Sequence, residues 1–215
     1  YMRPNRVASA GVFLGAMYGG YVVSPVSLLA QDALIEHTLA HSATRIVFAA
    51  RQFVPRLAAI VSRTGSRAIV RATTPDDLEL RAARGDESGR ALEATTPAML
   101  MYTSGTTGTP KGALLAHGNL VHAGRAVAAA HELTPADCVL SSLPLYHVNG
   151  QCIATVSPLV SGGSIVMPHR FSVSQWWPLV ERYRPTWLNI VPTIIAYLLN
   201  GPDLTPAQAA ACRRI

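Results

Sequence analysis

Apolar positions along the chain follow two alternating patterns, one with a helical period and one confined to short runs. Val7, Leu14 and Tyr18 fall on one face of a helix that we expect to end at the glycines 19–20. Short apolar runs predict strands over residues 21–23, 45–49, 68–70, 98–102, 111–116, 139–143, 164–167 and 187–191. Helical periods predict helices over residues 31–41, 55–62, 119–131, 151–159, 172–183 and 193–200. This alternation predicts an α/β fold with largely parallel sheets covered on both faces.

Two parts of the pattern have a more specific interpretation. Thr74, followed by Pro75 and two aspartates, is a typical helix start, whereas the polar residues 84–96 predict a loop. Trp176 and Trp177 would suit either a pocket wall or a core. Because they accompany apolar residues at helical spacing, we expect them to fill the core beneath a sheet-covering helix.

Composition indicates a globular chain with an apolar exterior. Its 215 residues are 49% hydrophobic and only 14% charged, so a substantial core can form and part of the surface is expected to be covered. The net charge is +6, but the arginines are scattered, which disfavours nucleic-acid binding. Cys138, Cys152 and Cys212 share no metal-ligand spacing, which indicates reduced thiols of a cytoplasmic protein.

The uncharged segment 7–30 is a candidate for a signal or membrane segment. Its glycines 19–20 and Pro25 interrupt it, and its halves differ in period, so a helix followed by a strand explains it better. We therefore expect no transmembrane or targeting segment. Because the chain starts at Tyr1 and stops at Ile215 without a closing element, we expect it to be an excerpt of a longer protein.

The stretch from residue 103 to residue 112 has the composition of a phosphate-binding loop. Glycines permit positive φ and bring backbone N–H groups close to an anion, while hydroxyl groups and an ammonium bind phosphate oxygens. Lys111 is the only lysine of the chain, which favours a specific need for an ammonium there. The residues predicted to bind phosphate are Thr103, Ser104, Gly105, Thr106, Thr107, Gly108, Thr109, Lys111 and Gly112.

Two other interpretations of this loop are a P-loop and an ordinary solvated turn. It nearly fits the P-loop pattern G-x-x-x-x-G-K-[ST], but Pro110 replaces the second glycine and Gly112 replaces the hydroxyl that binds Mg²⁺. A P-loop also opens a helix, whereas residues 111–116 predict a second strand. A solvated turn has a similar composition, but the length of the loop and its terminal lysine disfavour that interpretation. We therefore expect a phosphate-binding loop that joins two strands.

The ten residues 103–112, Thr-Ser-Gly-Thr-Thr-Gly-Thr-Pro-Lys-Gly, resemble position for position the signature loop of adenylate-forming enzymes. This superfamily includes the acyl-CoA synthetases, the adenylation domains of peptide synthetases and the luciferases. The flanking stretches agree, so the resemblance covers essentially the whole chain. It implies a layered αβαβα fold with two sheet subdomains of mostly parallel strands, truncated here to part of a large N-terminal domain.

On this pattern, residues 1–132 form the first αβ subdomain and residues 133–215 the first half of the second, while the C-terminal domain is absent. The family's adenine and Mg²⁺ segment, its ribose-binding aspartate and its late catalytic lysine have no counterpart. Because Lys111 is the only lysine, no other position can supply the catalytic one. We therefore assign no catalytic residue and expect that this piece alone forms no acyl-adenylate.

A second candidate site is the sequence Leu-Pro-Leu-Tyr-His-Val-Asn-Gly at residues 143–150, directly after a predicted strand. Open α/β sheets bind ligands at the carboxyl ends of their strands. The resemblance places His147 beside the acyl pocket and the thiol channel, although a purely structural histidine is the default alternative. We expect His147, Asn149 and Gly150 to contact substrate without acid–base chemistry, and residues 189–193 to line the same crevice.

The resemblance implies a two-step reaction. A carboxylate attacks the α-phosphorus of Mg·ATP to give an acyl-adenylate and pyrophosphate, and coenzyme A then displaces AMP. The implied ligands are a small-molecule carboxylic acid, ATP, Mg²⁺ and CoA, and the metal ligands are unknown. Residues 146–150 and the layout of residues 176–191 favour an AMP-forming acyl-CoA synthetase for a fatty, aromatic or small organic acid, with a role in fatty acid metabolism as one expectation.

Other functions stay open from the sequence. The chain would also suit an adenylation domain that loads a carrier protein, or a noncatalytic nucleotide-binding or scaffolding fragment. A Walker-type phosphohydrolase is disfavoured by Pro110 and Gly112. The expected partners are the acid, ATP, CoA and the remainder of the same chain.

Overall fold

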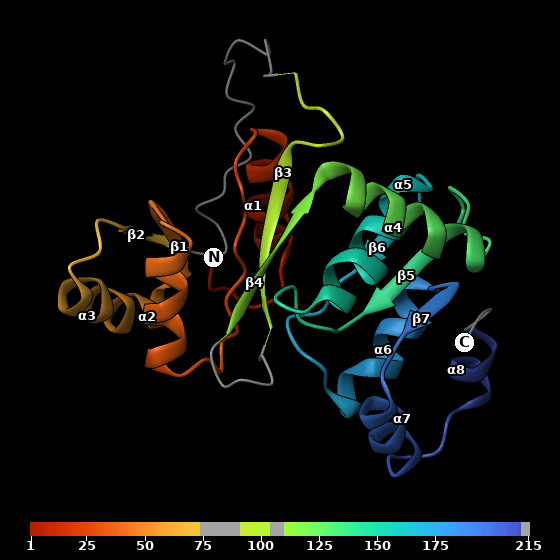
Figure 1. The fold of residues 1–215 in the computed structure, drawn as a ribbon. Coiled ribbons are helices and arrows are strands. Elements are labelled where there is room, and N and C mark those ends of the chain that lie inside the picture. The colour runs from red at the N-terminus through yellow and green to blue at the C-terminus, as the bar shows by residue number, and fades with distance from the viewer. Residues whose placement is uncertain (74–90, 104–109, 212–215) are drawn as a thin grey trace. The chain divides into compact units, whose positions relative to one another are not determined.

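The structure is a computed structural model that describes residues 1–73, 91–103 and 110–211 (Figure 1). Its internal contacts divide it into two compact units, Tyr1–Asn119 and Leu120–Ile215. This division falls inside helix α4 (His117–Ala130). The subdomain boundary expected after residue 132 stays a prediction.

The described strands of the first unit form two separate two-stranded sheets. One is parallel and the other is an antiparallel hairpin. The parallel strands are β1 (Ile46–Ala50) and β2 (Ile69–Thr73), and the hairpin strands are β3 (Pro97–Thr103) and β4 (Lys111–Ala116). The helices of this unit are α1 (Val7–Tyr18), α2 (Asp32–His41), the short 3₁₀ helix η1 (Arg51–Phe53) and α3 (Val54–Thr64).

The core of the first unit lies between α2, α3 and β1. Ile35 and Leu39 of α2 meet Leu57 and Ile60 of α3 in one buried cluster. Burial of each such side chain contributes about 1.5–3 kcal/mol relative to exposure. Gly65 then ends α3 in a left-handed conformation (φ 64°), which a glycine adopts without steric cost.

One predicted strand of the first unit is wrong. Of residues 21–23, only Val23 pairs, in an isolated bridge with Met99. Tyr21 is largely exposed, and Pro25 has no backbone N–H with which a longer ladder could continue. The helix start expected at Thr74 lies outside the described residues.

The second unit contains a parallel sheet with β5 (Cys138–Ser141) at its centre. Its neighbours are β6 (Ser164–Val166) and β7 (Trp187–Asn189). The helices of this unit, besides α4, are the π-helix η2 (Asn149–Val156), α5 (Ser157–Val160), α6 (Val173–Tyr183), α7 (Pro192–Leu199) and α8 (Pro206–Ala211). Parallel strands with helical connections confirm the predicted α/β class.

The core of the second unit joins the sheet to α6. Leu140 and Leu188 of neighbouring strands pack with Trp176 and Val180 of the helix. Trp176 is only 1% exposed, which confirms the prediction that it fills a core. None of the described helices has both the length and the apolar character needed to cross a membrane.

Several elements of the second unit differ from the sequence prediction: β7 ends two residues early, at Asn189, and α8 was not predicted. The helix expected over residues 151–159 begins earlier, as the π-helix η2, and continues as the single turn α5. Its neighbour β5 ends at Ser141, two residues before the predicted end. The chain therefore leaves the sheet early and enters a turn that precedes an unusual helix, and π-helical turns occur frequently at functional sites.

Candidate functional site

The hairpin β3–β4 brings the two ends of the predicted phosphate loop together. Its register pairs Thr103 with Lys111 and Tyr102 with Gly112. The prediction that this loop joins two strands is therefore confirmed. The other predicted phosphate ligands, Ser104, Gly105, Thr106, Thr107, Gly108 and Thr109, lie outside the described residues. We refer to the paired ends, residues 102–103 and 110–112, as the loop stem.

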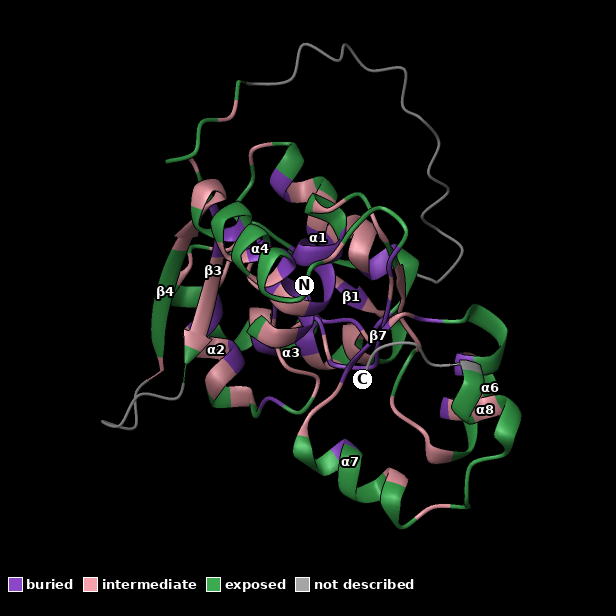
Figure 2. Ribbon diagram, turned by 90° about the vertical axis from the view of Figure 1, so that its right-hand side faces the viewer, coloured by how far each residue is buried: buried purple, intermediate pink, exposed green. Residues whose placement is uncertain are grey.

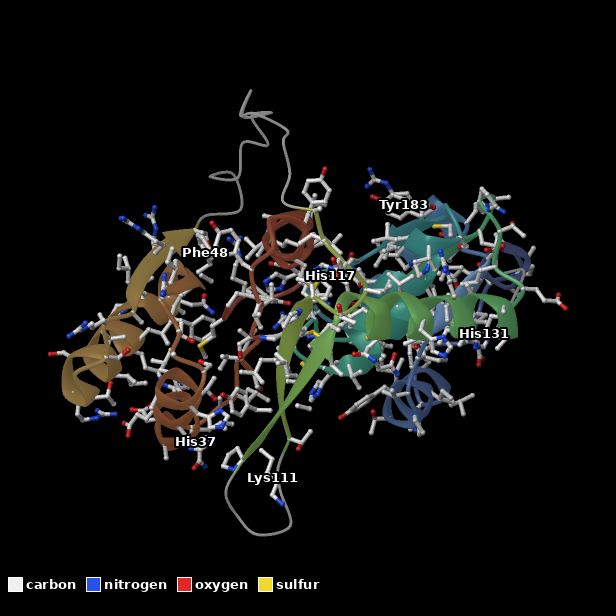
Figure 3. The ribbon with its side chains drawn as sticks, turned by 45° about the horizontal axis from the view of Figure 1, so that its top comes forward. His37, Phe48, Lys111, His117, His131 and Tyr183 are labelled. Carbon is white, nitrogen blue, oxygen red and sulfur yellow. The ribbon has the colours of Figure 1, made fainter. Side chains whose placement is uncertain are left out.

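Lys111 is exposed. It lies at the end of the hairpin where the loop connects the two strands (Figure 3). Within the described part of the chain, it forms no salt bridge with an acidic side chain. Thr103, on the opposite strand, is also exposed. A hydroxyl group and an uncompensated ammonium thus lie at the same end of the stem, which suits a polyanionic ligand.

Gly112 has a packing reason to be glycine. A Cβ atom there would lie 3.0 Å from Cδ1 of Leu100, 3.3 Å from Cε1 of His41 and 3.5 Å from Cε1 of Tyr102. The first two distances are shorter than ordinary van der Waals contact, so side chains from β3 and α2 would have to move. Close packing explains the glycine here without a ligand, whereas its predicted contact with phosphate stays a prediction.

Two histidines that sequence analysis missed contact the loop stem. His37 Nε2 lies 3.0 Å from the carbonyl oxygen of Pro110, and His41 Nδ1 lies 2.8 Å from the hydroxyl oxygen of Tyr102. Their spacing of four residues on a helix was the available signal, because it places both rings on one face. That spacing alone does not predict which segment this face of the helix contacts.

In the second candidate site, residues 143–150 form a turn and the start of the π-helix. The backbone N–H of His147 donates to the carbonyl of Pro144 (3.0 Å), and that of Gln151 donates to the carbonyl of His147 (3.1 Å). His147 is exposed, and its ring centroid lies 4.8 Å from that of Tyr146. An exposed imidazole does not fill a core, and the predicted contact of His147 with substrate stays a prediction.

Asn149 and Gly150 are held in place by contacts with buried groups. The side-chain amide of Asn189, at the end of β7, donates to Oδ1 of Asn149 (2.8 Å). Asn189 is only 5% exposed, so it supports Asn149 and does not itself line an open surface. Gly150 is buried against the carbonyl groups of Leu143 and Pro144. Of the three residues predicted here, His147 is exposed, Asn149 is half-buried and Gly150 is buried.

The described residues contain no group of three or more His, Cys, Asp or Glu side chains that would hold a metal ion. Cys138 and Cys152 are free thiols, and Cys212 lies outside the described residues. Burial raises the pKa of the Cys152 thiol, so it remains protonated and is unsuited to act as a nucleophile.

Comparison with known proteins gives consistent results. The family described as "AMP-binding enzyme" matches residues 2–214. The sulfoacetate–CoA ligase of Cupriavidus necator is 46% identical over an alignment of 215 positions, which covers 98% of this chain and 42% of that protein. The oxalate–CoA ligase of Arabidopsis thaliana is 37% identical over 105 residues, which are 48% of this chain and 20% of that protein.

Solved structures give the same picture. The ATP-bound crystal structure of MatB from Rhodopseudomonas palustris superposes with a TM-score of 0.83 and 28% identity, over 99% of this chain and 42% of that chain. Apo MatB superposes with a TM-score of 0.84 and 26% identity, over the same shares. The chain thus spans less than half the length of these relatives.

Proposed function

The chain belongs to the AMP-binding enzyme family of adenylate-forming enzymes, and from this premise we propose that it is part of an ATP-dependent acid–CoA ligase. The reaction joins a carboxylate to AMP with release of pyrophosphate, and then transfers the acyl group to the thiol of CoA with release of AMP. The observation that carries the proposal is the loop stem, which presents Thr103 and Lys111 at the same end of a hairpin, with no salt bridge to Lys111 within the described residues. The sequence resemblance of residues 103–112 supports the same assignment.

The chain's contribution to the first step is electrostatic and positional. Adenylation releases pyrophosphate, so negative charge must be stabilised on the β- and γ-phosphates as the bond to the α-phosphorus breaks. Lys111 supplies a positive charge for these oxygens, and the hydroxyl groups of the loop, including that of Thr103, supply hydrogen bonds. Mg²⁺ is implied by the family, but the described residues contain no group of three or more His, Cys, Asp or Glu side chains, and we assign it no ligand.

The acid is proposed to be small and to carry a second anionic group. Two of the relatives are named for such acids, sulfoacetate and oxalate, and the first of these matches along nearly the whole chain. Contact with the acid is assigned to His147, with Asn149 and Gly150 shaping the turn beneath it. A fatty or aromatic acid and a cytoplasmic location stay predictions from the sequence.

The decisive experiment uses the complete natural polypeptide that carries this chain. Acids are supplied singly with Mg·ATP, and exchange of labelled pyrophosphate into ATP reports the adenylation step. Formation of acyl-CoA and AMP, followed by mass spectrometry, reports the second step. We expect both steps with sulfoacetate or oxalate, and weaker turnover with fatty and aromatic acids. Absence of exchange with every acid would contradict the proposal.

The same assay separates the remaining functions. Exchange without acyl-CoA formation would indicate a carrier protein as the acceptor. ATP binding without exchange would indicate a noncatalytic nucleotide-binding protein. We expect the isolated 215-residue piece to show no exchange, because the family's adenine segment and late catalytic lysine have no counterpart in it. Robust exchange by this piece would overturn that expectation.

A further inference from the structure

Helix α2 presents three faces with different partners. Its buried face, with Ile35 and Leu39, packs into the core of the first unit. Its acidic face carries Asp32 and Glu36, which form salt bridges with Arg56 and Arg63 of α3. These contacts fix both the position and the rotation of the helix. The third face, with His37 and His41, is thereby held in a single orientation.

The face of α2 that carries His37 and His41 contacts the loop stem. The carbonyl oxygen of Pro110 can only accept a hydrogen bond, so His37 Nε2, at 3.0 Å, must be the donor. The two imidazoles stack on each other, with ring centroids 5.5 Å apart and planes inclined by 22°. Tyr102 meets both rings edge-on, at centroid distances of 6.0 Å from His37 and 5.7 Å from His41. Three aromatic rings therefore form one packed group beside the hairpin.

This group contacts the chain on both sides of Lys111. His37 binds the carbonyl of the residue before the lysine, and His41 packs against Gly112, the residue after it. Burial raises the pKa of the Tyr102 phenol, an effect that a hydrogen bond from Ser42 opposes more weakly, so Tyr102 remains protonated near neutral pH. Its hydroxyl group thus keeps a proton for the hydrogen bond that it shares with His41. Figure 3 shows His37 and Lys111 toward the same end of the hairpin.

We propose that His37 and His41 are positioning residues for nucleotide binding, which fix the backbone of Lys111 from the two adjacent residues. Lysine has a flexible side chain with four carbons, so the direction of its ammonium depends on a backbone that does not move. β4 is an exposed strand with a single partner among the described residues, and it needs such external support. The inference rests on the proposed function for its consequence, weaker binding of ATP, but not for its structural content.

Three variants of the complete polypeptide test the inference. His37→Phe keeps the ring and its stacking but removes the hydrogen-bond donor. His37→Gln keeps a side-chain N–H donor at a position comparable to Nε2, and should rescue the lost interaction. His122→Phe is the matched control, because His122 is an exposed histidine of α4 outside the loop stem.

Two measurements are made on each variant. Amide hydrogen exchange of the peptide that covers β4, without nucleotide, reports the stem itself, and calorimetric titration with Mg·ATP reports binding. In His37→Phe we expect exchange to be faster and ATP affinity weaker, each by about fivefold, as for the loss of one hydrogen bond. His37→Gln should lie close to the wild type in both measurements, and His122→Phe should not differ from it.

The outcomes separate this inference from the proposed function. Unchanged exchange in His37→Phe would overturn the inference, because the stem would then not depend on the histidine. Faster exchange with unchanged ATP affinity would overturn the assigned role in nucleotide binding. If the wild-type protein binds no ATP, the proposed function fails, and the same result overturns the role of these histidines in nucleotide binding. Hydrogen exchange then still shows whether they support the stem.

Discussion

The loop stem carries its candidate ligand-binding residues on exposed strand ends, whereas residues 143–150 carry theirs on a turn with a buried base. Lys111 and Thr103 are exposed, and β4 is exposed along most of its length (Figure 2). In the second site, His147 is exposed but Gly150 and the supporting Asn189 are buried. The first site is supported by side chains from a separate helix, and the second by backbone carbonyls and one amide pair.

This difference predicts how mutations divide between stability and function. Exposed side chains contribute little to the free energy of unfolding, so substitutions in the loop stem should weaken ligand binding without lowering stability. Buried groups in close contact with the backbone contribute both to stability and to ligand binding. The surrounding protein cannot relax around a change there without a cost in free energy. The predictions below test this contrast, from the largest expected effect to the smallest.

Gly150→Ala should be the most damaging substitution. The added methyl carbon would lie 2.8 Å from the carbonyl carbon of Pro144 and 2.9 Å from the carbonyl oxygen of Leu143, and neither backbone atom can move freely. We expect a loss of about 3 kcal/mol or more in the free energy of unfolding, measured by chemical denaturation.

The matched control is Gly15→Ala in α1, where an added methyl group meets nothing within 4 Å. There we expect a gain of about 0.5–1 kcal/mol, because alanine favours a helix. Equal effects at the two positions would show that the turn at residue 150 is not tightly packed.

Asn189→Ala should be next in size. It removes the buried donor to Asn149 and leaves the amide oxygen of Asn149 without that partner, at an expected cost of about 1–3 kcal/mol. The Michaelis constant for the acid should rise as well, because Asn149 loses its support.

Asn200→Ala provides a close control for this substitution. Asn200 donates from the same atom over the same 2.8 Å, to the carbonyl of Ala196, but its hydrogen bond is exposed. We expect a change within about 0.5 kcal/mol there. If the two alanine variants lose equal stability, burial is not what distinguishes the second site.

Lys111→Ala should separate function from stability in the stem. Because the side chain is exposed and forms no salt bridge within the described residues, the unfolding free energy should change by less than about 0.5 kcal/mol. ATP affinity, or pyrophosphate-linked turnover, should fall by about tenfold or more, as for the loss of a charge-assisted hydrogen bond. Unchanged kinetics would refute the assignment, and Lys111→Arg should show an intermediate value.

The smallest expected effect concerns the salt bridges that orient α2. Hydrogen bonds from Arg56 and then Arg63 lower the pKa of Asp32. Because the pKa of Asp32 is lower in the folded state than in the unfolded state, its ionised form stabilises the protein at pH values above the unfolded-state pKa of about 3.9. This stabilisation is lost as the pH falls through the folded-state pKa. Asp32→Asn should therefore lower the melting temperature slightly near neutral pH and not in strong acid. High salt should reduce the difference, since the pair is exposed, and a difference that persists in acid would contradict this account.

Much of the fold could be predicted from the pattern of residues. The extent of α1, the apolar runs of β3 and β5 and the strand-loop-strand arrangement around residues 103–112 are local properties. The apolar face predicted for α1 was wrong, because Val7 and Tyr18 are each 79% exposed whereas Phe13 and Met17 are buried. The strand over residues 21–23 was wrong because pairing depends on what lies beside it, and only Val23 meets a partner. The π-helix η2 was missed because its sequence differs little from that of an α-helix.

The sequence by itself determined the family of this protein, through a hydroxyl- and glycine-rich loop that ends in its only lysine and resembles the signature loop of adenylate-forming enzymes; that the loop binds phosphate stays a prediction. Local composition suffices for this because phosphate binding needs particular groups at short spacing. Tertiary structure alone decided the contacts that hold the two candidate sites. His37 and His41 contact the loop stem from 73 and 61 residues away in sequence, and Asn189 binds Asn149 in the second site. Contacts between distant segments depend on the packing of whole helices, and no local pattern of side chains encodes them.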